Sequence, residues 1–241
     1  ELQDTVTAMG HGARSLLIEN VMGGDVEDPP TLTPATIRQR WGLPADAPVV
    51  LYTGTFEAYQ GLELLIEAAA RLQTTHPHAR VLVVGGEPGQ VEAATGVARA
   101  HGAANVVFTG QQPAREIPAF VALAAILASP RIRGTNTPLK IYSYLRSGTP
   151  IVATNLLTHT QVLSPEVARL VDPEPAQFAA ALAALLDDPA AGRALAPAAR
   201  ALWAARDSRG VYPPRTAGAC RRLAAARDGA PARPATETVA R

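Results

Sequence analysis

The chain has 241 residues, of which 47% are hydrophobic and 18% are charged, a balance typical of globular proteins and unlike that of disordered ones. The net charge of +1 gives no bulk electrostatic reason to expect nucleic acid as a partner. A single cysteine, Cys220, excludes an internal disulfide. The longest apolar run, Ala119–Ala128, is too short to span a bilayer.

The first 48 residues lack the regular alternation of strands and helices that the sequence predicts from residue 49 onward. Leu2–Met9 has the pattern of a helix end, Ser15–Ile18 that of a strand and Pro34–Trp41 that of a short helix, with the linker-like stretch GGDVEDPPTLTP leading into the last. The chain also begins at Glu1 without a methionine and without a basic-then-apolar leader. We therefore expect part of the protein to lie upstream, and residues 1–30 to be the tail of a preceding domain with its hinge.

Between residues 49 and 171, short apolar strands alternate with helical segments. The predicted helices are Leu62–Gln73, Gln90–His101, Glu116–Ala124 and 138–147. The predicted strands are Val49–Thr53, Arg80–Val84, Asn105–Thr109, Ala125–Ser129, Ile151–Thr154 and Ala168–Val171. Continuous apolar strands separated by amphipathic helices indicate a parallel sheet covered on both faces. We therefore predict a doubly wound α/β domain.

After Glu174 the sequence becomes helical and rich in alanine. It predicts helices over Gln177–Leu186, over Ala190–Arg206 and from about Arg215 to Arg227. The final stretch, DGAPARPATETVAR, lacks an apolar face. We predict one domain over residues 31–224 and a disordered tail over 225–241.

Ligands of an open parallel sheet bind beyond the carboxyl ends of its strands. Four segments converge there, namely Gly54–Gly61, Gly85–Gln90, Gly110–Pro113 and Ser129–Lys140. Gly54 and Gly85 would let the backbone approach a ligand, although glycines after strands are usually turns. The sequence has no G-x-G-x-x-G or G-x-x-x-x-G-K-[ST] pattern, which disfavours dinucleotide and P-loop sites. Since it has no H-E-x-x-H motif or clustered Cys and His pattern either, we expect neither a metal nor a cofactor.

The start of the helix over 138–147 is the strongest candidate for an anion site. Thr137 suits the N-cap position and Pro138 the first helical position. The free N–H groups of a first helical turn, together with the helix dipole, favour an anion such as phosphate. Lys140 in that turn opposes the dipole, which a bound anion would explain; a lysine that points into solvent is the equally weighted alternative.

Four segments resemble the C-terminal, donor-binding half of family 4 (group 1) glycosyltransferases. They are VVLYTGTFEAYQGLELLIEAAARL, RVLVVGGEP, NVVFTGQQPAREIPAFVALA and SPRIRGTNTPLKIYSYLRSGTPIVATN. The resemblance covers roughly residues 13–223. It implies an enzyme of the GT-B type, in which two Rossmann-like domains face each other across a cleft. It also implies that SLLIENVMGGD is the hinge at which the chain leaves the acceptor domain.

The same resemblance shows where this sequence departs from the family. Such enzymes typically carry two glutamates with seven residues between them, one at the sugar and one at the ribose. The matching positions are Thr135 and Ser143. They often carry a basic pair after the first strand for the diphosphate, and the matching Thr55 and Gln60 are neutral.

A sugar transferase must stabilise the departing nucleoside diphosphate, mainly with aligned N–H dipoles and cations. We assign this role to the backbone N–H groups of Leu139 and Lys140 and to the Lys140 ammonium. Arg131 and Arg133 are candidates for further cations. No residue qualifies as a general base, so the catalytic residues stay unassigned.

The weaker candidates each have a plain structural alternative. Thr135 and Asn136 would hydrogen-bond the sugar or form an ordinary turn. Ser143 would reach the ribose or lie at the surface, and Glu57 would contact the donor or stay solvated. The residues expected to be structural are Tyr142, Tyr144 and His159.

The leading hypothesis is a retaining hexosyltransferase of which this chain is the donor half. Its partners would be a nucleotide sugar and a glycan, lipid-linked or small-molecule acceptor, with no nucleic acid. We expect a cytoplasmic enzyme, and peripheral membrane association through the preceding domain stays open. A non-catalytic nucleotide-sugar-binding or regulatory module is the alternative. A sugar-nucleotide epimerase is disfavoured because its acid–base groups are sparse here.

Overall fold

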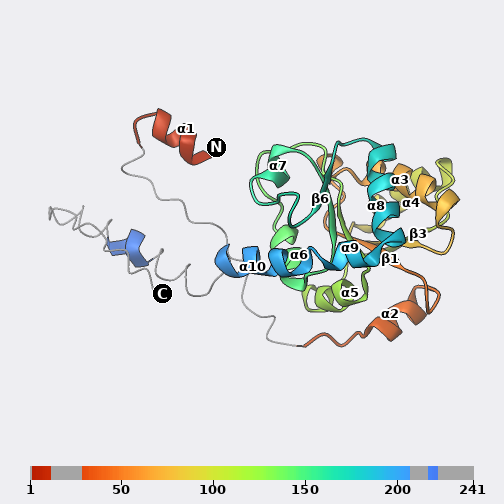
Figure 1. Ribbon diagram of the computed structural model, residues 1–241. Helices are drawn as coiled ribbons and strands as arrows, with labels where there is room; N and C mark the ends of the chain where they lie inside the picture. Colours follow the sequence, from red (N-terminus) through yellow and green to blue (C-terminus); the bar gives the residue numbers. More distant parts are fainter. Residues whose placement is uncertain (1, 12–28, 207–216, 222–241) are drawn as a thin grey trace. The chain divides into compact units, whose positions relative to one another are not determined.

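The computed structural model describes residues 2–11, 29–206 and 217–221, and the chain divides into two compact units (Figure 1). The larger unit, Met22–Ala204, contains a six-stranded sheet in the order β3-β2-β1-β4-β5-β6, with every neighbouring pair of strands parallel. The strands are β1 Val49–Thr53, β2 Arg80–Val84, β3 Val106–Gly110, β4 Ile126–Ser129, β5 Ile151–Thr154 and β6 Arg169–Val171. This is the predicted doubly wound α/β fold.

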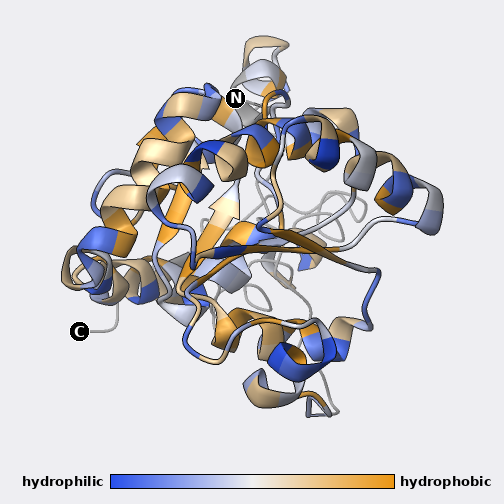
Figure 2. Ribbon diagram, turned by 90° about the vertical axis from the view of Figure 1, so that its right-hand side faces the viewer, coloured by the Kyte–Doolittle hydropathy of each residue, from blue (hydrophilic) through white to orange (hydrophobic). Residues whose placement is uncertain are grey.

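The strands form where the sequence is apolar on both faces. Every residue of β1, β4 and β5 is buried, whereas the edge strands β3 and β6 contain partly exposed residues. Figure 2 shows the hydrophobic strands in the interior and helices with mixed, partly hydrophilic surfaces around them. The predicted strands agree with the observed ones to within one residue at either end.

Helices cover both faces of the sheet. The first face packs against α3 (Leu62–Thr75), α4 (Pro88–Ala100) and α8 (Pro175–Asp187), and Leu65 and Phe178 are fully buried there. The second face packs against α2 (Pro34–Arg40), α5 (Ile117–Leu123), α6 (Lys140–Ser147) and α10 (Ala196–Arg206). Burial of both faces of the central strands explains why the strand pattern is continuous rather than alternating.

Several helix boundaries differ from the predicted ones for local reasons. Helix α4 starts two residues early because the side chains of Glu87 and Gln90 form a capping box ahead of it. The segment predicted as one helix over Ala190–Arg206 is divided into α9 (Pro189–Arg193) and α10, because Pro197 cannot lie inside a continuous helix. The sequence did not predict the short helices η2 (Ala58–Gln60), η3 (Ala114–Glu116) and α7 (Leu157–Thr160).

The segment ahead of α2, at Thr31 and Leu32, is hydrogen-bonded to Glu116, which follows β3. Glu116, whose residue is only 3% exposed, accepts hydrogen bonds from the Thr31 hydroxyl, the Thr31 N–H and the Leu32 N–H. Arg115 donates to the same carboxylate. These hydrogen bonds, with that of the Thr31 hydroxyl first, lower the pKa of Glu116 to about 2.

The smaller unit is described only in part. Its helix α1 covers Leu2–Ala8, close to the predicted Leu2–Met9, and residues 217–221 are helical within the predicted last helix. The predicted strand Ser15–Ile18 and the predicted tail lie outside the described residues. Within the described part of the chain, no helix combines the length and the apolar character needed to cross a membrane.

Candidate functional site

The site lies where the strand order of the sheet reverses. Strands β1 and β4 are neighbours, and the chain continues from them to helices on opposite faces. Beyond such a switch point, the loops after the two central strands separate and leave a crevice for a ligand. Here they are the segment from Gly54 to Gly61 and the segment from Pro130 to Leu139. The predicted site residues lie on these two segments, on α6 and, in the case of Gly85, at the end of β2.

Close backbone packing holds the two loops together. The Ile132 N–H donates to the Tyr59 carbonyl at 2.9 Å. Gly61 has φ +72°, and a Cβ there would lie 1.9 Å from the Pro130 carbonyl oxygen. Gly85, with φ +130°, lies against the Gly54 carbonyl in the same way. The glycines after these strands are thus required by contacts between chain segments, whether or not a ligand also approaches them.

Lys140 reaches from α6 across the switch point to the end of β1. Its Nζ donates to the Thr53 carbonyl at 3.1 Å and lies 3.8 Å from the centroid of the Tyr52 ring. Burial, with a smaller contribution from the charge of Arg131, lowers the pKa of Lys140 to about 7. It is also the only lysine in the chain. The ammonium lies beside Gly54, the residue just before the neutral Thr55.

The start of α6 differs from the predicted one. The helix begins at Lys140, Leu139 occupies the N-cap position, and no side chain caps it, so Thr137 is not the cap. The Asn136 carbonyl already accepts from Arg131 and Thr158, which keeps the segment before Pro138 irregular. No hydrogen bond engages the backbone N–H groups of Leu139 and Lys140 within the described residues. Both donors remain available to an anion.

Two further residues of α6 lie beside this start. The Ser143 hydroxyl donates to the Lys140 carbonyl at 2.8 Å, so its hydrogen is used inside the helix while its oxygen can still accept. Tyr144 is fully buried, and its hydroxyl contacts the N–H and the hydroxyl of Thr53 at 3.1 Å each. The prediction that Tyr142 and Tyr144 are packing residues is confirmed by their burial.

Arg131 is buried beneath the loop after β4. Its guanidinium donates to the carbonyls of Arg133 and Asn136, to Asn136 Oδ1 and to the Thr158 hydroxyl. Arg133, Thr135 and Asn136, which follow Arg131 in the loop, are exposed residues. Arg131 is therefore committed to the protein interior, whereas Arg133 is the arginine of the pair that faces outward.

His159 has the structural role that we favoured. It is fully buried, with Nε2 2.8 Å from the Ser129 hydroxyl and Nδ1 2.9 Å from the Thr154 carbonyl. Burial lowers the pKa of His159 to about 4, so the ring is neutral near pH 7. It cross-links the ends of β4 and β5 below the loops.

A cavity of about 540 Å³ lies beside this edge, over the first turns of α3. Its lining is mainly apolar, with three glutamates, and of the predicted site residues it includes only Glu57. Gln60 directly precedes Gly61, which lines the cavity, and the Gln60 Oε1 is buried without a hydrogen-bond partner. Because three glutamates line the cavity and Lys140 does not, the start of α6 is the better candidate for an anion site.

The charge around the start of α6 is uncompensated. Within the described part of the chain, no carboxylate hydrogen-bonds to or forms an ion pair with Lys140 or Arg131. Elsewhere, Glu63, Glu67 and His101 bring one potential metal-ligand atom each to within 4.8 Å of one another. That group is on α3 and at the end of α4, and the sequence pattern did not single it out.

Some members of the site had a sequence signal that was overlooked. Strands β1, β4 and β5 end in Thr53, Ser129 and Thr154, and a hydroxyl residue at the carboxyl end of a buried strand is available to a polar network. The aromatic support of Lys140 by Tyr52 had no such signal, because Tyr52 looks like any other buried strand residue.

Comparison with known proteins gives this geometry a context. The profile of the family described as glycosyl transferases group 1 matches residues 34–202. D-inositol 3-phosphate glycosyltransferase of Acidothermus cellulolyticus is 33% identical over 165 residues, which are 64% of this chain and 36% of that protein. The chain thus spans about a third of the length of this relative.

Solved structures share the fold. Anabaena HepE in complex with UDP-glucose superposes with a TM-score of 0.75 at 20% identity, over 92% of this chain and 61% of that one. The C-terminal domain of a group 1 glycosyl transferase from Francisella tularensis has a TM-score of 0.61 at 18% identity. The match covers 75% of this chain and 96% of that domain.

Proposed function

Because the chain belongs to the group 1 glycosyl transferases, we propose that it is the donor-binding part of an enzyme that transfers a sugar from a nucleoside diphosphate sugar to an acceptor. The acceptor would be a glycan, a lipid-linked molecule or a small molecule. The relative from Acidothermus cellulolyticus is named as a glycosyltransferase, and HepE was solved with UDP-glucose. The first name supports sugar transfer, and the second supports a nucleotide sugar as the donor.

The observation that carries the proposal is the cationic, donor-rich start of α6. The Lys140 ammonium and the free N–H groups of Leu139 and Lys140 converge at the switch point, where no carboxylate of the described residues neutralises them. Transfer of a sugar breaks its bond to the diphosphate, which leaves with the electron pair and gains negative charge. Donors held in place before the reaction stabilise that charge without reorganising.

The remaining predicted contacts follow from the same placement. Asn136 uses its Oδ1 for Arg131, so its amide N–H₂ is the group left for a sugar hydroxyl. We propose Thr135 and the outward-facing Arg133 as its neighbours in the sugar subsite, and Ser143 for the ribose. Thr55, Glu57 and Gln60 on the opposite loop would border the donor. The donor site would thus contain hydroxyl and amide groups where such enzymes typically use carboxylates.

The proposal extends to architecture and location. The likeness to an isolated C-terminal domain supports placing residues 31–224 as the C-terminal Rossmann-like domain of a GT-B enzyme. Residues 1–30 would be the tail of the preceding domain with its hinge. Retention of the anomeric configuration is proposed on family grounds alone. We propose action in the cytoplasm, at the inner face of the membrane if the acceptor is a lipid.

The alternative is a binding or regulatory module that keeps the donor site without catalysis. Thr135 and Ser143, which replace the two carboxylates, are the observation that favours it. Such a module would bind a nucleoside diphosphate sugar but would not turn it over.

The test has two parts. Thermal-shift and calorimetric titrations with UDP, GDP, UDP-glucose and GDP-mannose should identify at least one ligand that stabilises the protein. Incubation of the protein with that donor and candidate acceptors should then release the nucleoside diphosphate. Binding without release would favour the module, and binding to none of the four ligands would contradict both hypotheses.

A further inference from the structure

We propose that Arg131 is a positioning residue of the donor site, which holds three loops of the ligand edge in the arrangement that leaves the start of α6 open to an anion. The inference rests on the proposed function for the nature of the anion. It assigns Arg131 a role that differs from the direct diphosphate contact considered from the sequence.

The contacts of the guanidinium set its role. Nε donates to the Arg133 carbonyl at 2.9 Å, and Nη1 donates to the Asn136 carbonyl at 2.9 Å. Nη2 donates to Asn136 Oδ1 at 3.1 Å. These bonds run back along the loop that leads into α6, so they fix the course of the segment just ahead of Leu139. A planar fork with several donors is the group suited to this task.

The same guanidinium contacts the two loops on either side. Its Cζ lies 4.8 Å from the centroid of the Tyr59 ring, on the loop after β1. Nη1 is 3.2 Å from the hydroxyl of Thr158, on α7 after β5, and that hydroxyl donates to the Asn136 carbonyl at 2.6 Å. Arg131 therefore joins the loops after β1, β4 and β5 through one side chain.

Burial makes this arrangement specific to arginine. Arg131 is only 5% exposed, and its partners within the described residues are uncharged acceptors and the Tyr59 ring. A buried charge that lacks a hydrogen bond is strongly unfavourable, so the loop must stay where its carbonyls can accept. A lysine would keep the charge, but its donors radiate from a single nitrogen and cannot reproduce the planar spread of Nε, Nη1 and Nη2.

Arg131 also acts on Lys140 through space. The pKa of Lys140 is lowered mainly by its burial and to a smaller extent by the positive charge of Arg131. The other titratable groups that face this lysine are Tyr52 beneath it and His159 from α7. Because Lys140 is the only lysine of the chain, selective ¹³C labelling of lysine gives one side-chain signal whose titration reports on this arrangement directly.

The experiment compares Arg131→Lys and Arg131→Gln with the wild-type protein. Lysine titration by NMR is combined with calorimetric affinity for UDP at pH 6, where Lys140 is protonated in every variant. We expect both substitutions to weaken UDP binding by about tenfold or more, because the loop before Leu139 loses its fixed course. Only Arg131→Gln should raise the midpoint of the Lys140 titration, since Arg131→Lys keeps the positive charge.

The remaining outcomes are distinguishable. If Arg131→Lys binds UDP as the wild type does, the fork has no positioning role and the inference is wrong. If Arg131→Gln does not fold, Thr158→Val removes one contact of the network without a change of charge and should weaken binding with the midpoint unchanged; unaltered binding would again overturn the inference. The titration needs no ligand, so it tests the arrangement even if wild-type protein binds no nucleoside diphosphate, a result that would count against the proposed function instead.

Discussion

The loop after β1 and the loop after β4 face each other across the switch point, yet different interactions hold them. The first is defined by backbone packing, with Gly61 against Pro130 and Gly85 against Gly54. The second is defined by buried polar and charged side chains, with Arg131 hydrogen-bonded to loop carbonyls. One loop therefore depends on the absence of side chains and the other on a particular side chain.

The comparison teaches where the charge of the site comes from. Thr55 and Gln60 leave the first loop without a cation at the two positions where the resemblance led us to expect one. Lys140 comes from the second side but places its ammonium beside Gly54, at the end of β1. The loop after β1 thus contributes close backbone packing, and the positive charge beside it comes from Lys140 on α6.

The largest effect, on stability, should come from disrupting the backbone packing of the loop after β1. Gly61→Ala would place a Cβ 1.9 Å from the Pro130 carbonyl at a backbone φ of +72°. We expect the free energy of unfolding to fall by about 2 to 4 kcal/mol, because both the contact and the conformation are unfavourable. Urea denaturation measures this. Gly89→Ala is the matched control, since a Cβ there meets nothing within 4 Å, and an equal loss in both variants would contradict the packing argument.

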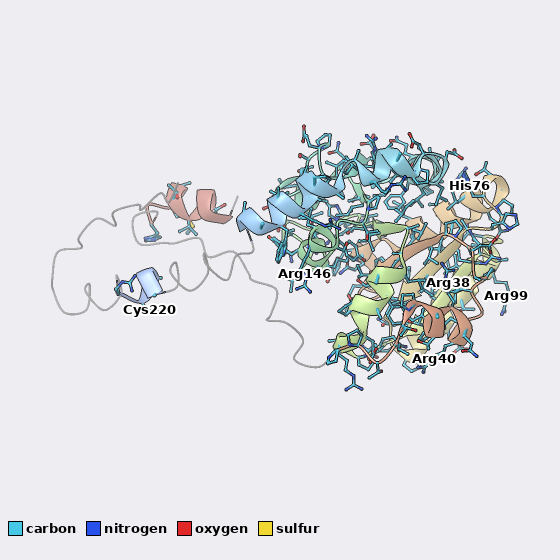
Figure 3. The ribbon with its side chains drawn as sticks, turned by 60° about the horizontal axis from the view of Figure 1, so that its bottom comes forward. Arg38, Arg40, His76, Arg99, Arg146 and Cys220 are labelled. Carbon is cyan, nitrogen blue, oxygen red and sulfur yellow. The ribbon has the colours of Figure 1, made fainter. Side chains whose placement is uncertain are left out.

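Removal of the cation should weaken ligand binding without destabilising the fold. Lys140→Met keeps the unbranched side chain as far as the ε position and removes only the ammonium, and we expect it to weaken UDP binding on the order of 10- to 100-fold at pH 6. Arg99→Met is the control for net charge, because Arg99 is exposed in the last turn of α4, away from the ligand edge (Figure 3). Calorimetry on both variants decides the matter: equal weakening would mean that Lys140 acts only through the overall charge.

The lowered pKa of Lys140 predicts a pH dependence on the same side. The unfolded chain holds this proton up to about pH 10.5, so Lys140 destabilises the folded protein below pH 7 and the effect fades as pH rises toward 10.5. A bound diphosphate favours the charged form, so the affinity for UDP-glucose should fall roughly five- to tenfold from pH 7 to pH 8.5. Calorimetry across this range checks the slope, and Lys140→Met should abolish it. A slope that persists in the variant would assign the proton to another group.

The two sides also differ in how far the sequence could predict them. The strands, the sheet and the loops that meet at its edge follow from hydrophobic periodicity and from the glycines, because both patterns are local. The predicted start of α6 was wrong by two residues, because the two donors that engage the Asn136 carbonyl, Arg131 and Thr158, lie 5 and 22 positions away in the sequence. The support of Lys140 by Tyr52 likewise depends on a contact across 88 positions that no local pattern encodes.

The smallest effect is expected for Glu116, a buried residue whose charge is opposite to that of Lys140. Glu116 is satisfied by N–H and hydroxyl donors from Thr31 and Leu32, whereas Lys140 is left without a carboxylate. Glu116→Gln should lower the Tm by roughly 5 °C at pH 7, because an amide is a weaker acceptor and its N–H₂ meets other donors. Glu92→Gln, on the exposed side of α4, should leave the Tm unchanged.

The pH profile of that Tm difference separates the carboxylate from a mere packing role. With its pKa lowered from 4.5 to about 2, Glu116 stabilises the folded protein above pH 4.5, and this contribution is lost as pH falls through 2. The difference in Tm between the wild type and Glu116→Gln should therefore shrink between pH 4.5 and pH 2. A constant difference would mean that the shape of the side chain, and not its charge, fastens the segment ahead of α2. If the difference shrinks, the Glu116 carboxylate is a buried charge that donors of the protein itself satisfy, whereas Lys140 has no carboxylate partner within the described residues.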